Sequence, residues 1–299
     1  MPASNAIELP PLPLSEWQDT QATLHMWMQI IGKVQLALTP LVNHWWNVSF
    51  MLTARGMQTQ ALHYANGTLE IAFDFIEHKL VMATSQGKTT VLPLRPQTVA
   101  DFYREVMQAL SDLGVKVKIW PVPVELADPI AFEKDIVHHS YDRDAVTKFW
   151  QIFSWADAVL KEFRAGFIGK SSPVHFFWGS FDLAVTRFSG RPAPERPGAD
   201  SITREAYSHE VSSAGLWPGG GPINGPAFYS YAAPEPAGFP EARVRPSQAF
   251  YDPNFKEFLL LYDDVRKAPS PYDALMDFLQ STYNAAADLG QWDRKALER

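Results

Sequence analysis

SPVHFFWGSFDLAVTRFSG, residues 172–190, is the most informative segment of the chain for its architecture. Its aromatic and aliphatic side chains are of the kind that fill a pleated, buried strand. Four polar or charged residues, His175, Ser180, Asp182 and Arg187, nevertheless lie within it. The stretch therefore predicts a buried β-strand that carries polar groups on at least one face.

Successive side chains of a strand point to opposite faces. A single strand over 172–190 would carry, on one face, His175, Phe177, Phe181, Leu183, Val185 and Arg187. The other face would carry Trp178, Ser180, Asp182 and Thr186. Burial of an unpaired carboxylate is costly, so Asp182 should have a partner or a raised pKa. The alternative is an ion pair between Asp182 and an arginine that only stabilises the edge of the sheet.

Helical and strand patterns occur twice along the chain, in the same order. The first series is a helix after Ser15 with Gln18 in the capping-box position, strands at 43–56, 57–64, 69–76, 79–85 and 89–94, a helix from Thr98 to Gly114 and a strand at 115–120. The second series is a helix over 146–167, strands at 172–190, 206–215, 226–233 and 257–264, and a helix over 272–289 before Gly290.

Two local matches indicate an internal repeat. Residues 44–50 and 175–181 share His, Ser and Phe at the same offsets, and the closing helices share Asp-Phe, Ala and Asp-Leu-Gly without a gap. We therefore predict an α+β protein of two related α-β(4–5)-α units. Their antiparallel sheets would pack against long helices about a pseudo-two-fold axis, by analogy with helix-grip ligand-binding folds.

The predicted boundaries follow from this order. We expect an extended Pro-rich tail at 1–14, a first unit at 15–123, a linker at 124–142 and a second unit at 143–299 that carries the candidate site. Two independent domains joined at 124–142 are the alternative. A cleft between packed units is a favoured place for a ligand.

Three segments resemble a family of bacterial proteins of unknown function: LHMWMQIIGKVQLALTPLVNHWW at 24–46, the opening stretch, and REAYSHEVSSAGLWPGG at 204–220. The resemblance covers residues 15–299. It implies one bacterial unit and brings with it no assigned activity, cofactor or substrate.

Composition and charge exclude several classes of protein. The net charge is −7 and no run of Lys or Arg stands out, so we expect no nucleic acid partner. The chain has no cysteine, which excludes disulfides, thiolate nucleophiles and cysteine-ligated metals. The first residues lack a signal-peptide pattern and no apolar run could span a membrane, so we expect a cytoplasmic protein without a membrane partner.

A second polar segment follows the opening stretch. His209 and Glu210 should face opposite ways in a strand, yet His175, His209 and a carboxylate such as Glu210 could form a 2-His-1-carboxylate metal site. Nothing in their spacing requires such a site. The glycine-rich loop at 217–226 lacks the pattern of a phosphate-binding loop, so it is either a hairpin loop or a lid with Trp217 as its apolar contact.

The sequence favours a cytoplasmic enzyme or small-molecule binder whose ligand is small and partly apolar or aromatic. The candidate acid/base groups are Asp182, His209 and His175, and the candidate ligand-binding residues are Trp178, Phe177, Ser180, Arg187, Tyr207, Glu210 and Trp217. Hydrolysis or isomerisation would need no cofactor, and the cofactor stays unknown. The alternatives are a non-catalytic scaffold protein and the metal-dependent version of the site.

Overall fold

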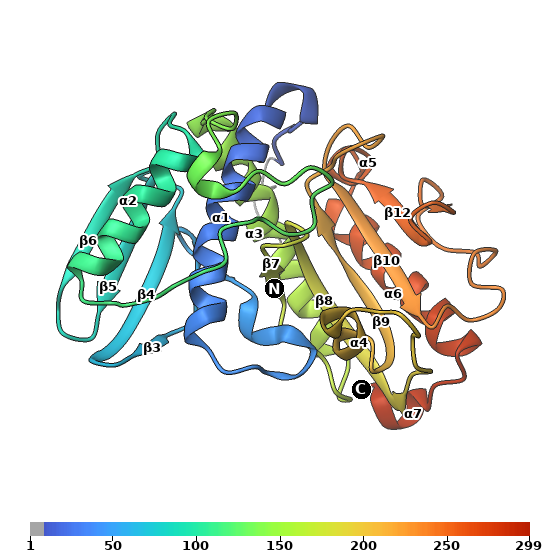
Figure 1. The fold of residues 1–299 in the computed structure, drawn as a ribbon. Helices are drawn as coiled ribbons and strands as arrows, with labels where there is room; N and C mark the ends of the chain where they lie inside the picture. The colour runs from blue at the N-terminus through green and yellow to red at the C-terminus, as the bar shows by residue number, and fades with distance from the viewer. Residues whose placement is uncertain (1–8) are drawn as a thin grey trace.

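The computed structural model describes residues 9–299 (Figure 1). It consists of helices and two antiparallel sheets, each of six strands, so the predicted α+β class is confirmed. The longer helices are α1 (Gln18–Leu38), α2 (Val99–Asp112), α3 (Arg143–Ala165) and α6 (Pro271–Leu289). The shorter ones are η1 (Leu14–Glu16), η2 (Asn43–Val48), η3 (Phe132–Lys134), α4 (Ser201–Ala206), α5 (Tyr262–Arg266) and α7 (Arg294–Leu297).

The first sheet has the strand order β1-β2-β4-β5-β6, and β3 also pairs with β4. Its strands are β1 (Met51–Thr53), β2 (Gly56–Gln58), β3 (Leu62–Tyr64), β4 (Gly67–Asp74), β5 (Lys79–Thr84) and β6 (Thr89–Pro93). The packed pair α1 and α2 lies on one side of this sheet (Figure 1). Buried and less buried side chains alternate along β5, which is typical of a sheet with one face in water.

The second sheet has the strand order β11-β12-β10-β9-β8-β7. Its strands are β7 (His175–Phe177), β8 (Asp182–Pro192), β9 (His209–Trp217), β10 (Ala227–Ala233), β11 (Phe250–Asp252) and β12 (Glu257–Leu261). Helices α3 and α6 contact each other and cover its rear face in Figure 1. Side chains on both faces of β9 and β10 are largely buried.

The two sheets meet edge to edge. Phe50, just before β1, and Phe176 of β7 exchange two backbone hydrogen bonds of 2.8 Å each. One cluster of buried hydrophobic side chains runs through both halves, from Leu9 to Trp292. Each sheet lies in the chain between a long helix and a closing helix, as predicted, and a common origin of the two halves stays a prediction.

The opening stretch is a β-hairpin and not the single strand that we predicted. Strands β7 and β8 pair with Phe177 opposite Asp182, and the chain reverses over residues 178–181. Phe181 has φ near +61°, a left-handed conformation that is uncommon outside glycine. The aromatic pattern continues through the turn and conceals it, although Gly179 within a strand pattern is a turn signal.

Other predicted elements also differ. The first part of residues 43–56 forms η2 (Asn43–Val48), with His44 and Trp45 at positive φ, and strand begins only at Met51. Residues 115–120 have no regular structure, because no neighbouring strand offers them hydrogen bonds. Helix α1 begins at Gln18 without a side-chain cap, so the predicted cap at Ser15 is wrong.

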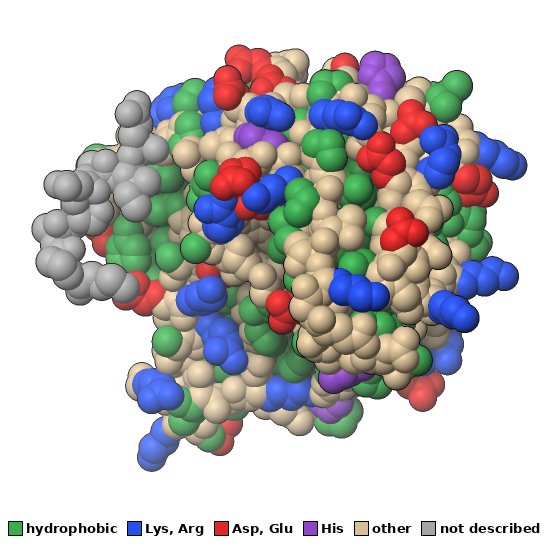
Figure 2. Space-filling view, turned by 90° about the vertical axis from the view of Figure 1, so that its left-hand side faces the viewer, with side chains coloured by type: hydrophobic (Ala, Val, Ile, Leu, Met, Phe, Trp, Pro, Cys, Tyr) green, Lys and Arg blue, Asp and Glu red, His purple; other side chains and the backbone are tan. Residues whose placement is uncertain are grey.

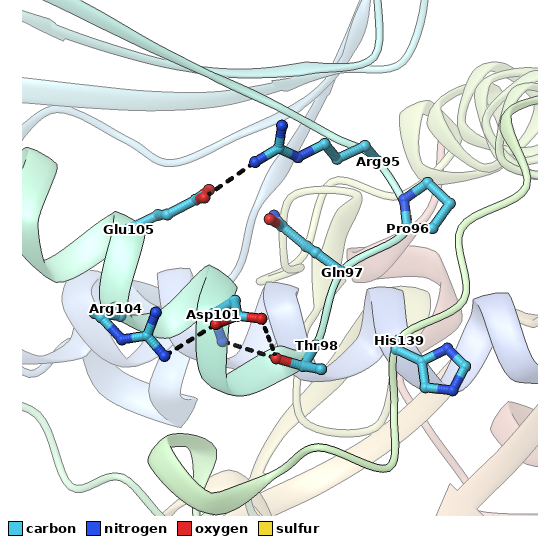
Figure 3. A pocket seen from close by; sticks show the side chains of 8 residues that line it. All are labelled: Arg95, Pro96, Gln97, Thr98, Asp101, Arg104, Glu105 and His139. Carbon is cyan, nitrogen blue, oxygen red and sulfur yellow. Dashed lines mark hydrogen bonds and ion pairs between the residues drawn. The ribbon is translucent and has the colours of Figure 1, made fainter.

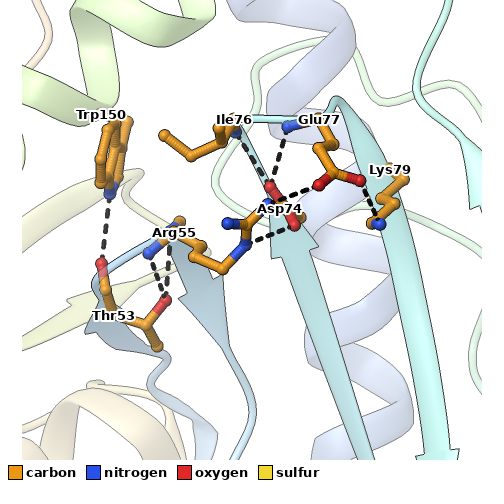
Figure 4. A network of polar contacts seen from close by, with 8 residues as sticks. Thr53, Arg55, Asp74, Ile76, Glu77, Lys79 and Trp150 are labelled. Atoms are coloured by element: carbon orange, nitrogen blue, oxygen red, sulfur yellow. Dashed lines mark hydrogen bonds and ion pairs between the residues drawn. The ribbon is translucent and has the colours of Figure 1, made fainter.

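The turn between β4 and β5 is held by a polar network (Figure 4). Asp74 accepts hydrogen bonds from the backbone N–H groups of Ile76 and Glu77 and, at 2.8 Å, from the Arg55 guanidinium. Burial acts to raise the pKa of Asp74, but these donors prevail and hold it below its ordinary value. Trp150 of α3 donates to the carbonyl of Thr53, which ties α3 to the first sheet.

Acidic and basic side chains are interspersed on the face of the molecule shown in Figure 2. Within residues 9–299, no helix is both long enough and apolar enough to cross a bilayer.

Candidate functional site

The second sheet turns a row of polar side chains away from α3 and α6. Residues paired directly across antiparallel strands share a face, and the pairing places Ala184, Gly215, Tyr229 and Leu259 in one row. Alternation along each strand then adds further polar residues to the same side. We call this side the polar face; it comprises Asp182, Thr186, Ser213, Tyr229, Tyr231 and Glu257.

Asp182 is the most enclosed acid of the polar face, with 8% of its surface exposed. The hydroxyl groups of Ser180 and Tyr229 both donate hydrogen bonds to its carboxyl group. The phenol of Tyr229 reaches it by crossing over Gly215, where any Cβ would collide with that phenol. The partner that we expected for Asp182 is therefore a pair of hydroxyl groups and not an arginine.

A second set of hydroxyl groups lies farther along the polar face. Thr186 and Ser213 are hydrogen-bonded across β8 and β9 at 2.9 Å. Tyr231 stacks against Tyr229, with ring centroids 6.1 Å apart, and its hydroxyl lies 3.0 Å from that of Tyr207. Tyr207 itself follows α4, outside the strand in which we predicted it.

Three carboxyl groups in this region have raised pKa values. Burial raises the pKa of Asp182, against the hydrogen bonds from Ser180 and Tyr229. Burial, and then the charges of Asp182 and Asp252, raise the pKa of Glu257 to about 7. Burial and Asp182 likewise raise the pKa of Glu125, whose carboxyl lies against Gly179 in the hairpin turn. Asp182 thus disfavours the charged forms of both glutamates.

Segments without regular sheet structure shield the polar face. In Figure 1, α4 and its flanking loops lie in front of β8 and β9, on the side opposite α6. At the other end of the face, Trp217 lies 6.2 Å from the exposed ring of Phe255, measured between centroids. Trp217 therefore has an aromatic neighbour at the surface, whereas a role as a lid stays a prediction.

His175 lies on the same side of the sheet as Asp182, because Phe177 pairs with Asp182 and His175 alternates with Phe177. We predicted opposite sides, and the hairpin reverses that assignment. The His175 Nδ1 atom lies 2.8 Å from the Ser49 hydroxyl, and its Nε2 is buried without a partner among the described residues. Burial lowers the pKa of His175 to about 3, so the ring is neutral.

His209 lies on the same side of the sheet as Asp182 but far from it. It begins β9, whereas Asp182 lies beside the other end of that strand, so the two are separated by roughly 25 Å at 3.3 Å per residue. His209 instead lies near His44, with ring centroids 5.8 Å apart. The structure therefore does not bring Asp182 and His209 together.

His44 forms a separate cluster with Lys170. The Lys170 ammonium lies 2.7 Å from His44 Nε2 and 4.9 Å from the ring centroid of Phe188. Burial, and then the charge of Lys170, lower the pKa of His44. A neutral His44 accepts the hydrogen bond from the ammonium.

Arg187 and Glu210 lie on the opposite side of the sheet from Asp182. Arg187 is 2% exposed and its guanidinium lies over the ring of Phe163, at 3.5 Å from the centroid, and near Tyr283. Burial lowers its pKa to about 10. Glu210 forms an ion pair with Arg191 at 2.7 Å. Their positions give no support to the predicted ligand-binding roles.

The predicted metal ligands are not brought together either. His175 contacts Ser49, His209 lies near His44, and Glu210 faces away from both. Across residues 9–299, no three His, Cys, Asp or Glu side chains are arranged to hold a metal ion.

A hollow of about 480 Å³ lies elsewhere, at the start of α2 (Figure 3). Its charged groups are already paired, Arg95 with Glu105 and Arg104 with Asp101. The first N–H groups of α2 are also occupied, by the carbonyls of His138 and Asp135 and by Thr98. The hollow therefore offers few free donors to a ligand.

Sequence reasoning missed Tyr229, Tyr231, Glu257 and Glu125. The first two were within reach, because the alternation in AFYSYAA, residues 227–233, places both tyrosines on one face. Glu257 and Glu125 carried no local signal. Burial in the folded protein is the first cause of their raised pKa values, and the charge of Asp182, which is distant in the sequence from both, adds to it.

Comparison with known proteins supplies a family but no activity. No curated protein and no solved structure matches the chain. A model of a family of unknown function, DUF5996, matches residues 9–299, which is nearly the whole chain. The predicted membership of a family without known function is thereby confirmed, and this chain belongs to the DUF5996 family.

Proposed function

We propose that the polar face of the second sheet binds a small, partly apolar or aromatic molecule and that Glu257 exchanges a proton with it. The observation that carries this proposal is the position of Glu257, a partly buried carboxyl with a pKa of about 7, on the face that also holds Asp182 and Tyr229. Perturbed acids that share one surface are typical of functional sites.

The chemistry is acid/base catalysis without a required cofactor. A carboxyl group with a pKa of about 7 is present in both protonation states at neutral pH, so it can donate or accept a proton. Burial and Asp182 raise the pKa of Tyr229, so its phenol stays protonated as a hydrogen-bond donor. Asp182 and Tyr229 orient the polar part of the ligand, and Trp217 contacts its apolar part. The reaction is of hydrolase or isomerase type, in the cytoplasm of a bacterium.

A non-catalytic scaffold is the second candidate, and one observation favours it. The Asp182 carboxyl already accepts two hydrogen bonds from within the protein, from Ser180 and Tyr229. A network that is satisfied in this way can hold β8 and β10 together across β9 without any ligand.

Solution NMR with small aromatic probes separates the two candidates. We would titrate benzyl alcohol and phenol into the ¹⁵N-labelled protein and follow the backbone amides. Ligand binding predicts shifts in β8, β9, β10 and β12, and weaker binding in Glu257→Gln and in Tyr229→Phe. Glu77→Gln, an exposed change on the first sheet, is the matched control and should bind as the wild type does.

Two outcomes of the titration would contradict ligand binding at the polar face. The proposal is wrong if neither probe, up to its solubility limit, shifts the amide signals of these strands. It is also wrong if the Glu257 and Tyr229 variants bind both probes as tightly as the wild type does. Either result would favour the non-catalytic scaffold. Probe binding that depends on Tyr229 but not on Glu257 would keep the site and remove the proton transfer.

A further inference from the structure

Lys33 of α1 is a buried lysine that the proposed function does not use. It is 5% exposed, and within residues 9–299 no hydrogen bond or ion pair reaches its ammonium. Its contacts are the rings of Trp120 and Trp178, whose centroids lie 5.2 Å and 6.0 Å from Nζ. Burial is the one resolved cause of its lowered pKa, so no acid compensates the charge.

Trp178 supplies a second donor beside Lys33. Its indole is 5% exposed, and Nε1 is buried without a hydrogen-bond partner in the described part of the chain. The indole is pressed against Gly32, where any Cβ would collide with the ring. A buried N–H group without an acceptor costs free energy. The Nζ atom of Lys33 is not fully buried, so a ligand can approach the ammonium from solvent beside the two indoles.

Side chains of α1 hold the neighbouring hairpin turn and the loop around Val124 in place. His25 donates to the carbonyls of Trp178 and Gly179 at 3.0 Å and 2.9 Å. Gln29 exchanges two hydrogen bonds of 2.8 Å with the backbone of Val124. Trp120 belongs to the same loop but is 66% exposed, so the side of Lys33 that faces Trp120 is near the surface.

We propose that Lys33, Trp178 and Trp120 form a binding site for a small planar carboxylate. The Lys33 ammonium would bind the carboxylate group, and the body of the ligand would lie against the Trp120 ring. The proposal is independent of the function proposed for the polar face, because it uses none of its residues.

The donor set selects a carboxylate among the possible ligands. One ammonium matches a single negative charge, and its three N–H groups can reach both oxygens of one carboxylate. A phosphate brings more charge and more acceptors than this set satisfies. A cation would meet the uncompensated charge of Lys33, whereas a planar acid fits against indole rings.

Titration with benzoate, followed by tryptophan fluorescence and by calorimetry, tests the site. We expect saturable binding of benzoate, and binding at least about tenfold weaker for benzamide, which has the same shape without the charge. Lys33→Met keeps the apolar stem and should weaken benzoate binding by at least about tenfold. Lys88→Met, an exposed change in the turn between β5 and β6, is the control and should have no effect.

Trp120→Ala keeps the test valid if Lys33→Met fails to fold, because Trp120 is largely exposed and its removal should leave the fold intact. We expect it to weaken benzoate binding by about fivefold. Three results would overturn the proposal: no saturable binding of benzoate, equal binding of benzamide, or unchanged affinity in both Lys33→Met and Trp120→Ala.

Discussion

The two sheets have the same antiparallel construction but differ in their second faces. The face of the first sheet turned away from α1 and α2 meets water, and Val91 on β6 is 50% exposed there. The corresponding face of the second sheet holds Leu259, at 2% exposed, next to Tyr229 and Asp182. One sheet therefore needs a single apolar face, whereas the other must satisfy buried polar groups on its second face.

The two sheets also differ in the partners of their acidic side chains. The acids of the first sheet, such as Asp74 and Glu77, lie in a turn and are neutralised by Arg55 and Lys79. Asp182, on the second sheet, has only hydroxyl partners, and its neighbour Glu257 has no ion pair among the described residues. Charged acids with basic partners stabilise a structure. A buried acid whose pKa is raised is instead suited to exchange a proton with a ligand.

The largest contrast should come from truncating one side chain on each outer face. Leu259→Ala removes a buried side chain and should lower the free energy of unfolding by about 3 kcal/mol. Val91→Ala removes an exposed one and should change it by less than about 0.5 kcal/mol. Urea denaturation of both variants measures the difference. Equal effects would mean that the second face of the second sheet is not shielded.

A smaller effect is expected from Gly215→Ala, which places a methyl group under the Tyr229 phenol. The new Cβ would collide with that phenol and with the carbonyl of Leu183, so the variant should lose about 2 kcal/mol of stability. It should also release Tyr229 from Asp182. Tyrosine fluorescence and thermal denaturation would report both changes, and a variant as stable as the wild type would contradict the crossing of Tyr229 over β9.

The smallest effect is a change in the dependence of stability on pH. Because the pKa of Glu257 is raised from 4.5 to about 7, its contribution is fully present below pH 4.5 and is lost as the pH rises through about 7. Between pH 5 and pH 7, the slope of Tm against pH should therefore be more positive in Glu257→Gln than in the wild type. Glu77 should behave oppositely, because Lys79 and Arg55 lower its pKa and its contribution is lost as the pH falls. A slope unchanged in Glu257→Gln would show that this carboxyl titrates normally.

His175 should also make stability depend on pH, in the acidic range. Burial lowers its pKa from 6.5 to about 3, so its contribution is present at neutral pH and is lost as the pH falls from 6.5 toward 3.

Much of the fold could be predicted, because it depends on local patterns. The spacing of apolar side chains located all four long helices, and Thr98 caps α2 as a helix start signal predicts. The hairpin at β7 and β8 could not be found in this way. The aromatic residues of β7 continue through the turn as Trp178 and Phe181, so the one sign of a reversal is Gly179.

The candidate site was predictable only in part. Asp182 stood out as an acid in a buried stretch, and its raised pKa and its need for partners follow from burial alone. The grouping of Asp182 with His209 required the two to lie at the same end of a strand, which depends on strand register. Register is set by pairing with distant segments.

Local sequence patterns were enough to predict the class of fold, the long helices, the alternating strands and the burial of an acid in the second half. Folding was needed to bring Tyr229 to Asp182 across Gly215, to add Glu257 to them, and to place Lys33 beside two indoles. The two sets of features differ in the range of the interactions behind them. Periodicity and capping act within a few residues, whereas burial, hydrogen bonding and charge at these groups come from segments that meet only when the chain folds.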